Sequence, residues 1–338
     1  MVKASRLIAS ALGLLAATAF VFGGTASAET KTVRLAKQFG ISYLPLTIME
    51  TKHLLEEHGK KMGLDLKTDW VKFTSGTPMN EALISGNLDF ASGGVGPVLT
   101  IWGKIRNNLQ VKAVAAMNAM PLYLNTTNPN VKTIKDFTDK DRIALPAVRV
   151  SIQAITLQMA AEKAFGAGQE HKLDPLTVSL GHPDGMAQML GGHSEITAHL
   201  TSAPYQYQEL ADKRVHKVLD SYEVLGGPHT FNTVWITSKY YKENHDVVLA
   251  FLAAFEDAMT QITKDPAAAA ALWVKAENSK LPVAEAERII KLPENEWTMT
   301  PKKIMAYADY MARAKMIPVK PSSWQDVFFP DIHKLPGN

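Results

Sequence analysis

Short runs in which apolar and polar residues alternate recur along the first two thirds of the chain, and turn residues follow them. The run at 64–73 shows the pattern clearly, because charged or polar positions separate Leu64, Leu66, Trp70 and Phe73. Such alternation is typical of a strand with one buried face. Alternating or short apolar runs predict strands at 32–39, 64–73, 88–91, 142–145, 176–180 and 196–200.

Signals for the start of a helix follow these strands. Thr77 is placed to cap a helix that has Pro78 in its first turn, and Ser151 is placed to cap a helix over 152–165. Asp184 is placed to cap a helix that ends at Gly191 and Gly192. Further helices are predicted from Pro45 to His58, from the Gly93–Pro97 turn to Trp102, from 201–204 to Leu210, and at 247–263, 266–276, 283–291 and 301–315, the last capped by Thr300.

Six junctions at which a strand leads into a helix predict an α/β chain with largely parallel sheets. In open sheets of this kind, ligands bind beyond the carboxyl ends of the strands, where the helix N-termini meet. The free N–H groups and the positive end of the helix dipole favour anions at such ends. We therefore expect at these turns a small molecule that is anionic or at least rich in hydrogen-bond acceptors.

The first 28 residues have the pattern of an export signal. Lys3 and Arg6 give a positive start, an apolar run over 8–22 follows, and Ala26-Ser27-Ala28 matches a cleavage site. The chain has no cysteine to carry a lipid, and no later segment approaches 18 uncharged apolar residues. We expect a soluble periplasmic protein of residues 29–338, with a retained N-terminal anchor as the alternative.

Composition excludes several classes of function. The absence of cysteine excludes disulfides, thiolate metal sites and a cysteine nucleophile. Without Lys3 and Arg6, 34 basic and 33 acidic residues remain, and no basic block follows, so we expect no nucleic-acid partner. Sequence motifs of serine hydrolases, zinc proteases and phosphate-binding loops are missing, and His182, His193 and His199 lack metal-ligand spacing. We expect no catalytic residue, no metal and no cofactor.

The turns themselves supply the candidate ligand-binding residues. They combine aromatic rings, small hydroxyls, bare backbone and one guanidinium: Phe39, Tyr43, Ser75, Gly76, Gly94, Val95, Arg149, Ser151, His182, His199 and Thr201. Arg149 is the expected anchor for an oxyanion, and replacing it by alanine is expected to weaken binding at least about tenfold. The alternative is an arginine that braces its own lobe or faces water.

Several segments resemble periplasmic solute-binding proteins of the nitrate/sulfonate/taurine type, which serve ABC importers. The resemblance covers nearly all of the mature chain. Its segments are Lys72–Thr77 (KFTSGT), Glu81–Phe90 (EALISGNLDF), the Gly93–Pro97 turn, Arg142–Pro146 before the helix opened by a serine, and Phe231–Ile236 before Lys239 and Tyr240.

The resemblance implies a type II periplasmic-binding fold. Two α/β lobes, 29–120 plus 228–338 (lobe I) and 121–227 (lobe II), would be joined by hinge crossings near 118–124 and 225–233. It also implies ligand contacts on the return strand, at Phe231, Asn232 and Thr233. Taurine-type relatives carry an acid on that strand, so these neutral residues argue against an amino-sulfonate. Thr197 stands where many relatives have an acid, and His199 is therefore expected to help define the ligand.

The expected function is capture of a sulfonate- or carboxylate-like organic anion by hinge closure and delivery to an inner-membrane ABC permease. We expect the protein to act as a monomer. Two alternatives share the fold. One is a periplasmic sensor that docks on a receptor, and the other is a pyrimidine-related binder or enzyme, which the export signal disfavours.

Overall fold

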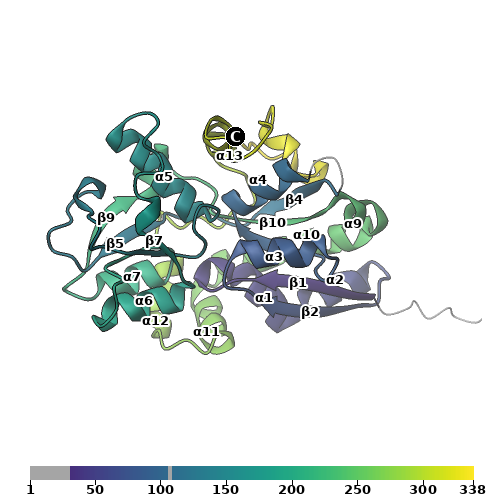
Figure 1. The fold of residues 1–338 in the computed structure, drawn as a ribbon. Helices are drawn as coiled ribbons and strands as arrows, with labels where there is room; N and C mark the ends of the chain where they lie inside the picture. The colour runs from purple at the N-terminus through teal and green to yellow at the C-terminus, as the bar shows by residue number, and fades with distance from the viewer. Residues whose placement is uncertain (1–30, 106–108) are drawn as a thin grey trace, which may run out of the picture.

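The computed structural model describes residues 31–105 and 109–338, and the expected export signal lies outside them. Helices flank three small β-sheets, which lie in two parts of the molecule (Figure 1). We use the predicted bounds to name these parts lobe I and lobe II. The strands are β1 (Lys31–Lys37), β2 (Leu66–Lys72), β3 (Ala91–Gly94), β4 (Val111–Ala116), β5 (Tyr123–Thr126), β6 (Ile143–Leu145), β7 (Thr177–Ser179), β8 (Ala198–Thr201), β9 (His216–Asp220) and β10 (Asn232–Thr237).

The sheets are mixed in strand direction. Lobe I holds the pair β1-β2 and the sheet β3-β10-β4, and lobe II holds the sheet β7-β6-β8-β5-β9. Strand β1 pairs parallel with β2, and β6 pairs parallel with β7 and β8. Strands β5 and β10 run antiparallel to both of their neighbours. The predicted parallel pairing therefore holds for β1 with β2 and for β6 with β7 and β8. It does not hold for β5 and β10, each of which follows a crossing between the lobes.

Thirteen α-helices surround the sheets in the described part of the chain. They are α1 (Leu44–Lys52), α2 (Leu54–Lys61), α3 (Gly76–Ile84), α4 (Val95–Lys104), α5 (Ile152–Phe165), α6 (His182–Gly191), α7 (Tyr205–Leu210), α8 (Ser221–Leu225), α9 (Ser238–Glu243), α10 (His245–Lys264), α11 (Pro266–Ala276), α12 (Val283–Ile290) and α13 (Ile304–Arg313). The predicted cap at Ser151 is confirmed, since its hydroxyl accepts a hydrogen bond from the Ala154 amide at 3.2 Å. No helix in this part of the chain is both long enough and apolar enough to cross a membrane.

Several predicted element ends are wrong. Helix α3 starts at Gly76, so Thr77 lies inside it, and α6 starts at His182, so Asp184 lies in its first turn. Helix α13 starts only at Ile304, after Lys303 adopts a φ of 53°, and Thr300 does not cap it. The predicted helix from Pro45 to His58 is divided by His53, which also has a φ of 53°.

The glycines at 93–94 form strand β3 instead of a turn. Asn232 and Thr233 on β10 pair with Gly94 and Gly93, so the backbone continues extended where the sequence suggested a loop. Absence of a side chain at Gly93 leaves room for Trp235, whose Cη2 would lie 3.2 Å from a Cβ there.

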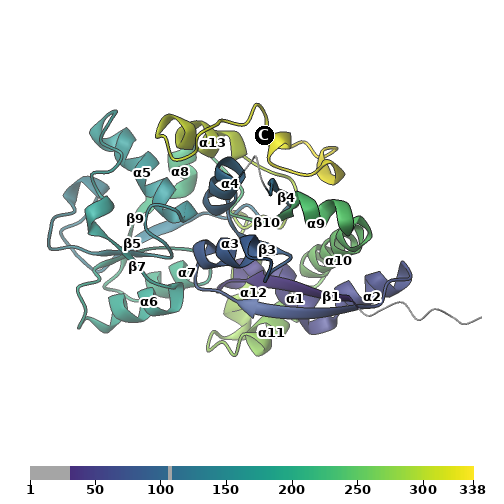
Figure 2. The same cartoon turned by 45° about the vertical axis from the view of Figure 1, so that its right-hand side comes forward.

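Two chain segments link the parts of the molecule. The first leads from β4 to β5 and the second from α8 to β10. They lie side by side, because the Phe231 amide donates to the Asn118 carbonyl at 3.0 Å and the Met117 amide donates to the Asn232 carbonyl at 2.8 Å. Helix α13 lies next to α4 and α5 in both views (Figures 1 and 2), and Tyr307 on α13 bonds Thr156 on α5, with 3.1 Å between the hydroxyl oxygens.

Candidate functional site

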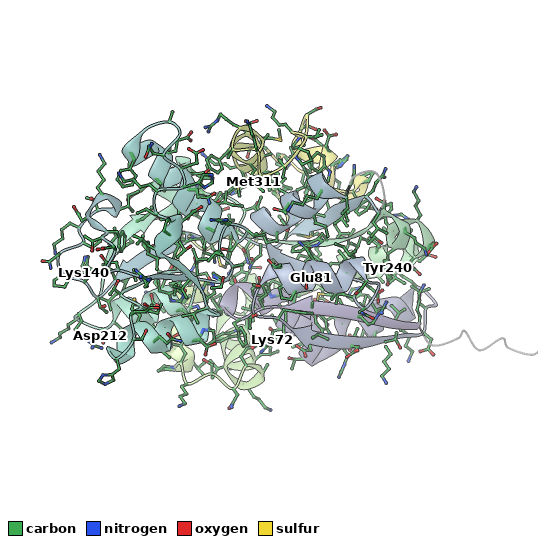
Figure 3. The ribbon with its side chains drawn as sticks, viewed as in Figure 1. Lys72, Glu81, Lys140, Asp212, Tyr240 and Met311 are labelled. Carbon is green, nitrogen blue, oxygen red and sulfur yellow. The ribbon has the colours of Figure 1, made fainter. Side chains whose placement is uncertain are left out.

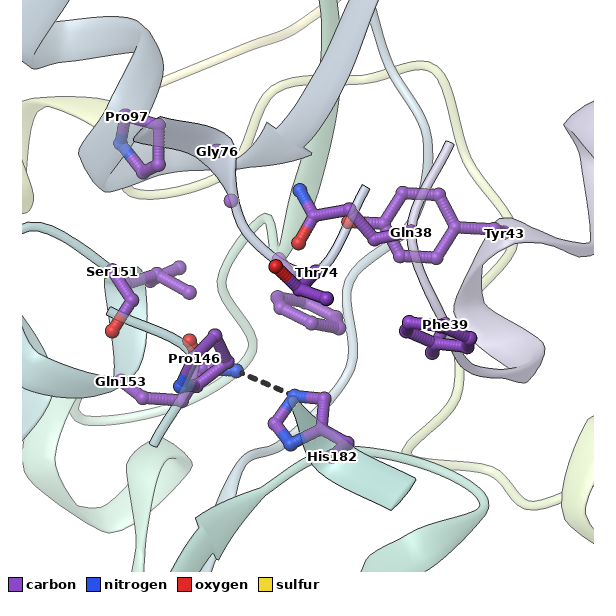
Figure 4. A pocket seen from close by; sticks show the side chains of 13 residues that line it. Gln38, Phe39, Tyr43, Thr74, Gly76, Pro97, Pro146, Ser151, Gln153 and His182 are labelled. Atoms are coloured by element: carbon purple, nitrogen blue, oxygen red, sulfur yellow. Dashed lines mark hydrogen bonds between the residues drawn. The ribbon is translucent and has the colours of Figure 1, made fainter. Parts of the chain in front are cut away.

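Four helices begin at one narrow cavity between the lobes (Figure 4). Helices α3 and α4 reach it from lobe I, and α5 and α6 reach it from lobe II. The cavity has a volume of only about 20 Å³, roughly the room that one water molecule needs. The lining residues are Gln38, Phe39, Tyr43, Thr74, Gly76, Gly94, Pro97, Pro146, Ser151, Ile152, Gln153, His182 and Phe231. The predicted meeting of helix N-termini is therefore present, and none of the described residues that line the cavity carries a carboxylate.

Aromatic and amide side chains form the wall from lobe I. The Gln38 amide donates to the Ser92 carbonyl at 3.0 Å, and the Tyr43 hydroxyl donates to Asn232 Oδ1 at 3.3 Å. Burial raises the pKa of Tyr43 well above its ordinary range, so this phenol stays protonated. Phe39 adds an apolar surface at the end of the first strand. This wall can hold an apolar group and offers neutral polar atoms beside it.

The wall from lobe II is more polar. Ser151 caps α5, Gln153 lies in the first turn of that helix, and His182 is the first residue of α6. The amide nitrogen of Gln153 lies 3.2 Å from His182 Nε2, as the dashed line in Figure 4 marks. Burial, and then the neighbouring His199 ring, lower the pKa of His182 well below its ordinary value. The imidazole is therefore neutral at pH 7.

Two glycines of the 93–97 segment let the lobes approach each other. A Cβ at Gly94 would lie 2.5 Å from Ile152 Cγ2, and one at Gly96 would lie 2.7 Å from the Val150 carbonyl oxygen. Both contacts join the start of α4 to the start of α5. In this structure, the two lobes are therefore closed on each other at the cavity.

Basic side chains near the cavity are already paired with acids. Lys37 Nζ lies 2.8 Å from Glu277 Oε1 and 2.6 Å from Glu50 Oε2, and Lys72 also pairs with Glu277. Burial raises the pKa of Glu277, but the charges and hydrogen bonds of Lys37 and Lys72 outweigh this and hold it below its ordinary value. Lys72 Nζ lies 5.4 Å from the centre of the Phe39 ring, and Figure 3 places Lys72 near the middle of the molecule.

Seven of the predicted site residues line the cavity: Phe39, Tyr43, Gly76, Gly94, Ser151, His182 and Phe231. Six others lie behind its wall: Ser75, Val95, His199, Thr201, Asn232 and Thr233. These support the lining residues. The Thr201 hydroxyl lies 3.1 Å from His182 Nδ1, and the Val95 amide donates to the Phe231 carbonyl at 3.2 Å.

Arg149 does not line the cavity in this structure, contrary to the expectation. Its side chain is 75% exposed, and its Nε lies 3.8 Å from Asp174 Oδ2 of the same lobe. The backbone at Arg149 has a φ of 63°, a left-handed turn just before α5, and this turn directs the side chain outward. The geometry matches the alternative role, an arginine that braces its own lobe.

Sequence reasoning missed six lining residues: Gln38, Thr74, Pro97, Pro146, Ile152 and Gln153. Gln38 and Thr74 directly precede the predicted residues Phe39 and Ser75. Gln153 lies in the first turn of the predicted α5, where N–H groups and short side chains face a ligand, and this position was a usable signal. Within the described residues, no group of three or more acidic or histidine side chains is arranged to hold a metal ion.

Comparison with known proteins gives similarity of structure only. No family model and no curated protein matches the sequence. The alkanesulfonate-binding protein of Xanthomonas axonopodis pv. citri, solved with MOPS, is 19% identical with a TM-score of 0.68, over 87% of this chain and 96% of that one. The periplasmic nitrate-binding protein of Synechocystis PCC 6803 is 14% identical with a TM-score of 0.69, over 88% and 85% of the two chains.

A third similar structure comes from Candida albicans and is described as having the generic periplasmic binding protein fold. It is 14% identical with a TM-score of 0.66, over 86% of this chain and 92% of that one. All three likenesses extend over both lobes. The expected fold is confirmed: this chain has the periplasmic-binding-protein fold, with its candidate site between the lobes.

Proposed function

We propose that this protein captures a small organic anion between its lobes and delivers it to an ABC permease. The observation that carries the proposal is the meeting of the N-termini of α3, α4, α5 and α6 at one cavity without a lining carboxylate. Each N-terminus favours a nearby negative charge by about 0.3–1 kcal/mol. The sulfonate- and nitrate-binding proteins of the same fold support an oxyanion ligand.

Aromatic residues in the wall favour an organic anion over a bare inorganic one. Phe39, Tyr43 and Phe231 line the cavity together with the polar side chains. They can cover an apolar substituent while the helix ends hold the charged group. We therefore place a sulfonate or carboxylate near the helix starts and its organic part against these rings.

Capture and release require the lobes to separate. The contact of Gly94 with Ile152 closes the cavity in the described arrangement. The paired crossing segments around Asn118 and Phe231 are the place where the hinge would bend. A ligand that contacts both lobes stabilises the closed shape, and a permease can recognise that shape. Because the proposed role is delivery to a permease, and because an export signal is expected, we assign the protein to the periplasm.

The first test is a binding panel on purified residues 29–338. Ethanesulfonate, benzoate and nitrate are compared by calorimetry and native mass spectrometry with two uncharged analogues, ethyl methyl sulfone and methyl benzoate. We expect at least one organic anion to bind with micromolar affinity, about −8 kcal/mol, and its uncharged analogue to bind at least tenfold more weakly. Equal binding of the uncharged analogue, or no binding of any anion, would overturn the proposal.

Delivery needs a separate test. Membranes of cells that produce the tagged protein are solubilised with the bound anion present, and the proteins that co-purify are identified. Recovery of an ABC permease supports transport. Recovery of a receptor without a permease would assign the protein to sensing instead.

A further inference from the structure

A buried chain of hydrogen-bonding groups leads from the interior of lobe II to the cavity. Glu209 Oε1 lies 2.6 Å from His199 Nδ1, and His199 Nε2 lies 3.0 Å from His182 Nδ1. The side chains of Glu209 and His199 are fully buried, and His182 is 6% exposed. We name these three residues the Glu-His-His chain.

The surrounding structure holds the Glu-His-His chain in place. Asn125 on β5 donates to Glu209 Oε2 at 2.9 Å. Helix α6 passes so close that a Cβ at Gly185 would lie 2.8 Å from His199 Nε2. A fixed arrangement of this kind lets a change at Glu209 act on His182, although Glu209 does not line the cavity.

When both imidazoles are neutral, the geometry of the Glu-His-His chain indicates where the ring protons lie. The short contact with the Glu209 carboxylate requires a proton on His199 Nδ1, so neutral His199 has a bare Nε2. That nitrogen accepts the proton on His182 Nδ1, which the Thr201 hydroxyl also faces at 3.1 Å. His182 Nε2 is then bare and accepts from the Gln153 amide at the cavity. A bare ring nitrogen repels the oxygen of an anion, whereas an N–H group would donate to it.

No lining residue of the described cavity carries a fixed positive charge, and His182 is the one that can gain a charge by taking up a proton. We infer that an anion binds in this cavity together with one proton, which His182 takes up from solvent and the Glu209 carboxylate stabilises through His199. The net charge of the Glu-His-His chain then changes from −1 to 0, and His182 presents Nε2–H to the anion. This inference rests on the proposed function and makes Glu209 and His199 positioning residues for the ligand.

Other titratable groups near His182 do not account for this proton uptake. Tyr205 on α7 packs at 5.7 Å between ring centres, and burial raises the pKa of its phenol, so it stays neutral. The carboxylates of Asp184 on α6 and Glu277 beyond α11 interact with Tyr205. The positive N-terminus of α6 opposes a charge on His182 when the cavity is empty, and a bound anion removes this opposition.

The experiment measures proton uptake on binding of ethanesulfonate, whose own charge is constant between pH 6 and 8. Calorimetry at pH 7 in Bis-Tris and in Tris, which differ in ionisation enthalpy, gives the number of protons taken up. We expect nearly one proton, and an affinity that decreases by up to tenfold for each pH unit from 6 to 8. If no organic anion of the panel binds at any pH, the proposed function and this inference both fail. If an anion binds with proton uptake near zero, this inference alone is wrong.

Variants test which groups take up the proton. His182→Gln keeps a polar side chain without a titrating ring, so proton uptake and the pH dependence of affinity are expected to disappear. Glu209→Gln keeps an acceptor for His199 but loses the charge, so proton uptake at pH 7 is expected to decrease. His193→Gln changes an exposed histidine and is expected to match the wild type. Should either buried variant fail to fold, ¹⁵N NMR of the wild-type imidazoles decides: Nε2 of His182 must be bare without ligand and protonated with it.

Discussion

Arg149 shows how backbone conformation decides what a charged side chain does. Ser151, two residues later, lines the cavity, yet the left-handed turn at Arg149 sends the guanidinium to the surface beside Asp174. An exposed ion pair of this kind contributes about 0–1 kcal/mol to stability. The sign of φ at a non-glycine residue is not visible in a hydrophobic pattern, so the sequence could not reveal this orientation.

We therefore expect Arg149→Ala to change the affinity for the bound anion by less than about threefold. Gln153→Ala is the contrasting variant, because Gln153 lines the cavity and contacts His182. Loss of one neutral hydrogen bond there is expected to weaken binding about three- to tenfold. Calorimetric titration of both variants makes the comparison. A tenfold loss for Arg149→Ala would mean that this side chain reaches the ligand after all.

His229 links acidity to the stability of the fold. It is buried in the second crossing segment, where Nδ1 lies 3.0 Å from the Thr230 carbonyl oxygen and Nε2 lies 2.8 Å from the Ser221 hydroxyl. Burial lowers its pKa from 6.5 to about 4. Between these two pH values, the unfolded chain binds a proton more readily than the folded one. The free energy of unfolding therefore decreases as the pH falls from 6.5 to about 4.

Urea unfolding should show this loss. Between pH 7 and pH 5, His229 alone is expected to lower the free energy of unfolding by about 2 kcal/mol. His182, whose pKa is also lowered, reduces the free energy of unfolding in the same direction. Comparing the wild type with His229→Gln therefore isolates the contribution of His229. The variant is expected to lose about 2 kcal/mol less than the wild type over this range. Parallel pH profiles for the two proteins would show that His229 does not cause the effect.

At the scale of elements, local signals predicted much of the helical structure. The Ser151 cap and the range 266–276 match α5 and α11, because a cap residue or an initial proline lies in the sequence itself. The sequence predicted less well those elements whose hydrogen-bonding partners lie far away along the chain. Strand β3 is shifted to 91–94 because its partner is β10, about 140 residues later. The contact between Glu209 and His199 joins a helix to a strand and has no sequence pattern of its own.

The contact between the starts of α4 and α5 gives a prediction about closure. In Gly94→Ala, the new Cβ would lie 2.5 Å from Cγ2 of Ile152, a methyl group on a buried, β-branched side chain that cannot turn aside. The closed arrangement is therefore expected to lose stability relative to the open one, and ligand affinity is expected to fall at least tenfold. Gly191→Ala is the matched control, since nothing lies within 4 Å of a Cβ there. Wild-type affinity in both variants would rule out this contact as part of closure.

At the scale of the whole molecule, the absence of cysteine allows lobe motion to be measured directly. Because the chain has no cysteine of its own, two introduced cysteines would be the only thiols available for labelling. Glu81 on α3 and Lys140 in lobe II are exposed, so Glu81→Cys with Lys140→Cys carries one dye on each lobe (Figure 3). If the ligand closes the lobes, energy transfer between the dyes should change when the anion is added.

The control pair places both dyes on lobe I, by Glu81→Cys with the exposed Lys239→Cys, and its energy transfer should stay constant. In the Gly94→Ala background, the response of the first pair should require higher ligand concentrations, because the clash opposes the closed state that the ligand stabilises. A constant signal from the first pair at saturating ligand would mean that the lobes are already closed before binding. In that case, the anion would enter without a hinge motion, and recognition by a permease would need another signal than closure.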